Sequence, residues 1–64
     1  MKVKEMIKKF KMSGNATVFV QHGITGDLVE LTQSELRNAE PEFIMGMKLN
    51  TFDITDNVLT LYVE

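Results

Sequence analysis

The sequence contains no cysteine and no tryptophan, and only one proline and one histidine. The lack of cysteine excludes disulfide bridges and thiolate metal sites within the chain. The single histidine, His22, cannot form a histidine-rich metal site in one copy of the chain. A chain of 64 residues buries only about 60% of its unfolded surface, so we expect a stability of a few kcal/mol. Oligomerisation or partner binding is the remaining common source of extra stability.

Long hydrophobic runs are also missing. No apolar segment approaches the roughly 18 residues that a membrane-spanning helix requires, and the lysine-rich residues 1–12 have no apolar signal-peptide core. The hydrophobic share of 44% and the charged share of 25% are typical of a globular domain. We therefore expect one cytoplasmic domain over residues 1–64, without a membrane partner and without a cofactor or metal.

The charges are divided along the chain. Residues 1–13 carry five lysines against one glutamate, which gives +4, whereas residues 14–64 carry two basic against eight acidic residues, which gives −6. If the basic helix packs on an acidic sheet, the two sets of charges largely cancel. If the basic and acidic segments do not pack together, their charges would steer charged partners toward the protein. The five lysines of the basic segment are Lys2, Lys4, Lys8, Lys9 and Lys11.

The first segment predicts an amphipathic helix over about residues 2–12, followed by the Ser13-Gly14-Asn15 stop. The apolar positions that follow the i, i+3, i+4, i+7 pattern are Val3, Met6, Ile7 and Phe10. Residues 16–21 and 27–32 are rich in β-branched and apolar side chains, which predicts two strands joined by a loop at residues 22–26.

The second half predicts a short helix and another hairpin. Thr32 and Glu35 have the spacing of a capping box, which opens a helix over about residues 33–39 that ends at Pro41. Two strands, near residues 43–54 and 58–63, are expected on either side of the Thr55-Asp56-Asn57 turn. The apolar residues change parity between Leu49 and Phe52, which predicts a bulge or break at residues 50–51.

These elements predict an α+β fold of order α-β-β-α-β-β with a four-stranded antiparallel sheet. Alternation assigns one sheet face to the core and leaves apolar residues on the other face, where either the second helix covers them or they form an interface. The expected core residues are Val18, Val20, Val29, Leu31, Leu59, Leu61 and Val63. The apolar residues of the opposite face are Phe19, Leu28, Ile44, Val58 and Tyr62.

The loop around His22 is the first place to look for chemistry. Gly23 and Gly26 are only three residues apart, no lysine follows them and a strand comes next, so the loop lacks the features of a phosphate-binding loop. No nucleophile stands in a motif with His22. We therefore expect no enzyme activity and no catalytic residue, and interpret His22 as a hairpin-loop residue and Ile24 as a possible protein anchor.

Two terminal segments resemble small accessory proteins encoded by bacteriophages and prophages. The opening VKEMIKKF…NATVFV (3–20) is similar to their helix, polar break and strand entry, and TFDITDNVLTLYVE (51–64) to their closing hairpin. This sequence has Ser13-Gly14 where their helix-to-strand break usually has a proline. The resemblance implies a small non-enzymatic protein in the host cytoplasm that binds and inhibits or redirects a host protein, as anti-CRISPR and other anti-defence proteins do.

The leading hypothesis is a protein-binding module that targets a host protein, such as a nucleic-acid-handling or defence protein. The expected contact residues are Phe19, Ile24, Asp27, Glu30, Glu35, Glu40, Glu42 and Tyr62. One alternative is a homo-oligomeric structural or accessory protein that self-associates, for instance as a homodimer, through its apolar sheet face. Another is a small DNA-associated factor that uses the lysines of the first helix to contact phosphates.

Overall fold

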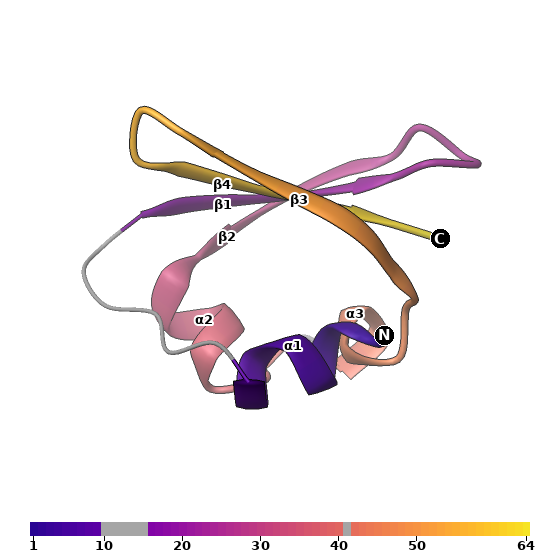
Figure 1. Cartoon of the computed structure of the whole chain (residues 1–64), viewed down its shortest axis with the longest axis horizontal. Helices are drawn as coiled ribbons and strands as arrows, with labels where there is room; N and C mark the ends of the chain where they lie inside the picture. Colours follow the sequence, from indigo (N-terminus) through magenta and orange to yellow (C-terminus); the bar gives the residue numbers. More distant parts are fainter. Residues whose placement is uncertain (10–15, 41) are drawn as a thin grey trace.

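The computed structural model describes residues 1–9, 16–40 and 42–64. In this part of the chain four strands form one sheet and three short helices lie beside it, which confirms the α+β class (Figure 1). The elements are α1 (Val3–Lys9), β1 (Thr17–His22), β2 (Leu28–Thr32), α2 (Gln33–Arg37), α3 (Glu42–Met45), β3 (Leu49–Thr55) and β4 (Val58–Val63).

The sheet is mixed, so the expectation of an antiparallel sheet was wrong. Its strand order is β2-β1-β4-β3, with two antiparallel hairpins joined through a parallel pair formed by β1 and β4. Thr17 lies opposite Val58 at one end of this pair, and His22 lies opposite Val63 at the other. Hairpin signals fix the direction of strands within each hairpin, but they do not fix how two hairpins meet.

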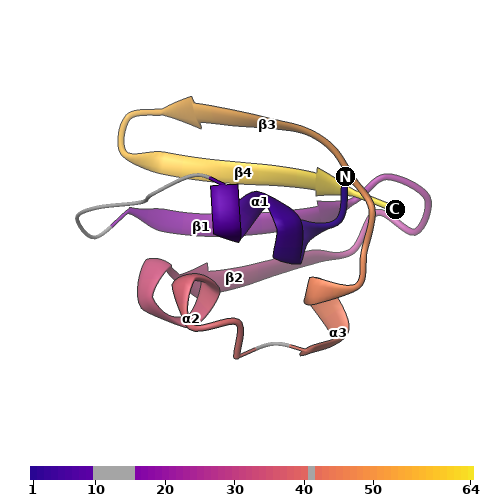
Figure 2. The same cartoon turned by 60° about the horizontal axis from the view of Figure 1, so that its bottom comes forward.

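All described helices lie on the same side of the sheet (Figure 1). A view of that side shows α1 in front of the central strands, with α2 and α3 on the β2 side (Figure 2). The core between the two layers contains Val3, Met6, Val18, Val20, Leu31, Leu36, Ile44, Met45, Leu49, Leu59, Leu61 and Val63. The alternation therefore predicted the core face correctly, although Val29 is only half-buried.

The first helix matches its predicted apolar stripe within the described residues. Val3 and Met6 are buried and Ile7 packs against the core. The Val3 N–H donates to the Met47 carbonyl at 3.0 Å, which ties the start of α1 to the turn after α3. The predicted helical residues 10–12 and the stop at residues 13–15 lie outside the described residues.

The capping box at the start of α2 is present as predicted. The Glu35 N–H donates to Thr32 Oγ1 at 3.1 Å, and Glu35 Oε1 accepts from the Thr32 N–H at 3.0 Å. The helix ends at Arg37, two residues earlier than expected, and Ala39 takes a left-handed conformation with φ of 55°. The predicted stop at Pro41 lies outside the described residues.

The strand predicted over residues 43–54 was wrong in its first part, where the chain forms α3. Phe43, Met45 and Met47 alternate with other residues and so imitate a strand, but Ile44 and Met45 are both buried although they are neighbours. Consecutive strand residues point to opposite faces, whereas one helical turn can place both against the same core. Ile44 consequently lies in the core and not on the opposite sheet face.

The rest of the second hairpin follows the sequence signals. The register of β3 and β4 shifts between Leu49 and Thr51, which confirms the break predicted from the parity change. Asp56 and Asn57 both have positive φ, 51° and 63°, as a two-residue turn of type I′ requires. Asp and Asn tolerate this left-handed region better than most residues, which explains why this pair forms the turn.

Candidate functional site

The sheet face opposite the helices has no covering layer within the described residues (Figure 1). Residues paired across strands point to the same side of a sheet, so the registers place on this surface the strand residues that alternate with the core-facing positions. We call it the open sheet face. It comprises Thr17, Phe19, Gln21, Leu28, Glu30, Thr32, Thr51, Asp53, Thr55, Val58, Thr60 and Tyr62.

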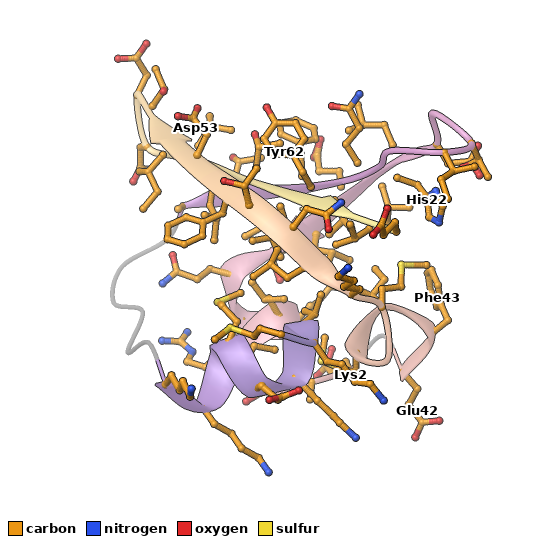
Figure 3. The ribbon with its side chains drawn as sticks, turned by 45° about the vertical axis from the view of Figure 1, so that its right-hand side comes forward. Lys2, His22, Glu42, Phe43, Asp53 and Tyr62 are labelled. Carbon is orange, nitrogen blue, oxygen red and sulfur yellow. The ribbon has the colours of Figure 1, made fainter. Side chains whose placement is uncertain are left out.

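Aromatic side chains lie on the two central strands of the open sheet face, and acidic side chains lie on its two edge strands. Phe19 is half-buried and lies between Glu30 on one neighbouring strand and Thr60 on the other. Thr60 in turn pairs with Asp53, so this cross-strand row carries a carboxylate at each edge of the sheet. Tyr62 is also half-buried and lies one pair further along β4. Figure 3 shows Tyr62 and Asp53 on the side of the sheet away from the helices.

Two of the predicted contact residues lie at the loop end of the β1–β2 hairpin. Ile24 is 77% exposed at the loop, and Asp27 is exposed where the chain enters β2. His22 Nδ1 accepts from the N–H groups of Ile24 and Thr25, each at 3.2 Å. His22 therefore folds the loop that presents Ile24, a role consistent with its interpretation as a loop residue.

The other three predicted carboxylates belong to a different surface. Glu35 is in α2, where its carboxylate is part of the capping box. Glu40 is exposed between α2 and α3, and Glu42 is exposed as the first residue of α3. All three lie in the layer of helices, whereas Glu30 lies on the open sheet face. The structure thus divides the predicted contact set into two groups on different sides of the molecule.

The described lysines of the first segment lie in the helix layer. Lys4, Lys8 and Lys9 are exposed on α1, and Lys2 is exposed just before it. Figure 3 shows Lys2 on the opposite side of the molecule from Asp53 and Tyr62. These lysines therefore share the helix layer with Glu35, Glu40 and Glu42, on the other side of the sheet from Glu30 and Asp53. Lys11 lies outside the described residues.

A groove that the sequence did not predict opens between the β1–β2 hairpin and α3. It has a volume of about 200 Å³, and its walls are mainly apolar. Phe43 on α3 is 65% exposed at this groove, and Val29 and Met47 are half-buried. The groove was missed because Phe43 and Met47 were assigned to one strand, whereas Phe43 lies on α3 and Met47 in the turn that follows it.

The full set of residues that line this groove is Val20, His22, Asp27, Val29, Phe43, Ile44, Met47 and Val63. No group of three or more His, Cys, Asp or Glu side chains in the described ranges is arranged to hold a metal ion. Over the same residues, no helix is long and apolar enough to cross a membrane. Comparison with family models, with curated proteins and with solved structures finds no match to this chain.

Proposed function

We propose that this chain is a non-enzymatic protein-binding module that uses the open sheet face to bind a basic surface of a host protein. The proposal includes a phage or mobile-element origin, action in the host cytoplasm, and inhibition or modulation of the bound protein. It rests chiefly on one observation, an uncovered sheet face that combines half-buried Phe19 and Tyr62 with exposed Glu30 and Asp53, while all described helices lie on the other side.

The composition of this face favours a protein partner. Half-buried Phe19 and Tyr62 provide broad apolar contact area, and aromatic residues are enriched where proteins bind one another. Glu30 and Asp53 stand at the two edges, and no residue of the open sheet face is basic. A basic partner surface would pair with these carboxylates, and electrostatic complementarity would accelerate the encounter.

The same charges oppose a symmetric dimer through this face. Two copies that meet face to face would bring Glu30 and Asp53 of both chains into one interface, where like charges repel. A strict monomer at micromolar concentration therefore agrees with the proposal. A dimer that dissociates when Phe19 is replaced by Ser would instead support the homo-oligomeric alternative.

The proposal is tested by matched charge reversals on the two sides of the molecule. The first variant carries Glu30→Lys and Asp53→Lys on the open sheet face, and the control carries Lys4→Glu and Lys8→Glu on α1. Circular dichroism checks that wild type and both variants are folded. Each protein is then used to capture proteins from the host cell. The captured protein is purified, and its binding to wild type and to both variants is measured directly.

We expect the sheet variant to lose the partner and the helix variant to retain it. Raising the salt concentration should weaken wild-type binding, because part of the attraction is between exposed charges. Loss of binding only in the helix variant would contradict the proposal. If that lost ligand is a nucleic acid, the DNA-associated alternative is supported, since the lysines of α1 are the phosphate-binding candidates.

A further inference from the structure

The outer edge of β2 has hydrogen-bonding groups that no described strand uses. The His22 N–H donates to the Asp27 carbonyl at 2.9 Å, which fixes the alternation along the antiparallel β1–β2 pair. Val29 therefore turns its backbone groups toward β1, whereas Leu28 and Glu30 turn theirs outward. The strand order places β2 at the edge of the sheet, so these outward groups face away from β1.

Only part of this edge is available to another strand, because the backbone N–H at its far end already has a hydrogen-bond partner. The Thr32 N–H is the next outward donor along β2, and it donates to the Glu35 carboxylate in the capping box. An added strand can therefore form ladder hydrogen bonds with two residues, Leu28 and Glu30. Edges of this kind accept extended peptides by strand addition, with affinity supplied by main-chain bonds and specificity by pockets for alternate side chains.

The apolar groove described above lies against the helix-side face of the sheet and includes Val29 of this edge strand in its lining. Val29 of β2 forms one wall, and Phe43 and Met47 form the opposite wall. Its volume of about 200 Å³ is below the roughly 300–1,000 Å³ typical of small-molecule sites, so it suits a single apolar side chain. Phe43 is 65% exposed here, which leaves apolar surface for an incoming side chain to cover.

The register of an added antiparallel strand determines which of its side chains enters the groove. A residue opposite Val29 points to the same side of the sheet as Val29, toward the groove. Its two neighbours lie opposite Glu30 and Leu28 and point to the open sheet face. Glu30 favours a basic residue opposite it, and Leu28, which is 59% exposed, favours an apolar one.

We propose that the outer edge of β2 and the groove lined by Val29 bind an extended segment of the partner protein by antiparallel strand addition. The recognised segment reads, from its N-terminal end, basic–apolar–apolar, with the central apolar side chain in the groove. This inference deepens the protein-binding function proposed above and rests on it, because it names the chemical form of the segment that is bound.

The test uses the full chain and a labelled, end-capped heptapeptide, Thr-Thr-Lys-Leu-Val-Thr-Thr, measured by fluorescence anisotropy. In the proposed register its Lys lies opposite Glu30, its Leu opposite Val29 and its Val opposite Leu28. N-methylation of the Val nitrogen removes an N–H that must bond to β2, so binding should fall at least about tenfold. N-methylation of the Leu nitrogen alters an N–H that points away from β2, and binding should be retained.

The protein side is tested by two substitutions at similarly exposed apolar residues, one on α3 at the groove and one on β3 at the other edge of the sheet. Phe43→Asp places a charge at the groove and should weaken peptide binding at least about tenfold. Ile54→Asp, on β3, changes a residue that is 67% exposed and should leave binding unchanged. In hydrogen exchange, the N–H groups of Leu28 and Glu30 should gain protection when the peptide binds.

Several outcomes would overturn this inference. These are absence of peptide binding up to about 1 mM, equal effects of the two N-methyl peptides, or equal effects of the two substitutions. Competition of the peptide with self-association of the protein would assign the edge to a second copy. If the peptide fails while the host protein is still captured through the open sheet face, only the strand-addition inference is lost. If the peptide binds but no protein is captured, the proposed function is lost instead.

Discussion

Removing the capping box of α2 should lower the stability of the whole domain by a measurable amount. The helix has only five residues, too few to form without tertiary contacts, and its buried Leu36 is fully excluded from solvent in the core. The two reciprocal bonds between Thr32 and Glu35, at 3.1 and 3.0 Å, satisfy one N–H at the first turn and one at the cap residue.

The expected magnitude follows from these bonds. Replacing an N-cap Thr by Ala costs about 1 kcal/mol, within a range of about 0.5–2 kcal/mol. We expect a similar loss of about 1 kcal/mol for Glu35→Ala, which also removes a favourable negative charge at a helix N-terminus. For a domain of this size, a loss of about 1 kcal/mol should lower Tm by about 4–8 °C, because the shift equals the lost free energy divided by the entropy of unfolding.

Urea denaturation followed by circular dichroism measures these effects in a double-mutant cycle. Glu35→Gln keeps an oxygen that can accept from the Thr32 N–H, so its free energy of unfolding should stay within about 0.5 kcal/mol of wild type. The double variant Thr32→Ala/Glu35→Ala should lose less than the sum of the single variants, because the two residues act as one unit. Strict additivity, or a Glu35→Ala variant as stable as wild type, would refute the structural role of this carboxylate.

Three further changes should follow from backbone conformation and burial. Gly26→Ala should destabilise the protein by about 1 kcal/mol in thermal melts, because Gly26 has φ of +78°. The control Gly46→Ala should be neutral or slightly stabilising, because Gly46 has no positive φ and an added Cβ would meet no close neighbour. Gln33→Leu should lower the free energy of unfolding by about 1–2 kcal/mol in chemical denaturation, because Gln33 Oε1 accepts from the Ala16 N–H at 2.7 Å and this backbone N–H loses its partner. An unchanged denaturation midpoint would argue against this hydrogen bond. Leu61→Ala should cost about 2–5 kcal/mol and leave the chain partly unfolded at 37 °C by circular dichroism, and a fully cooperative melt near the wild-type temperature would contradict the burial of this side chain.

Local signals predicted the elements whose causes are local. The capping box at Thr32 and Glu35, the turn at Asp56 and Asn57, and the bulge after Leu49 all depend on a few neighbouring residues. The parallel pairing of β1 with β4 depends instead on packing between two distant hairpins, which no turn residue specifies. This is why the sheet was expected to be antiparallel and is mixed.

The candidate site was predictable only where strand alternation determines it. Phe19 and Tyr62 could be assigned to the non-core face because their neighbours on either side are buried. Glu35 was expected to contact a partner, but its charge is used at the helix cap. The groove at Phe43 was missed because an alternating apolar pattern over a four-residue helix is indistinguishable from a strand.

The central claim is that the open sheet face contacts a partner protein, and site-specific photo-cross-linking tests it most directly. A photoreactive benzoyl-phenylalanine replaces Phe19 in one variant and Lys4, on α1, in the other, and both are produced in the host cell and irradiated. We expect a defined protein adduct from position 19, at most weak adducts from position 4, and loss of the first adduct when Glu30→Lys and Asp53→Lys are added. Adducts from position 4 without any from position 19 would contradict the central claim.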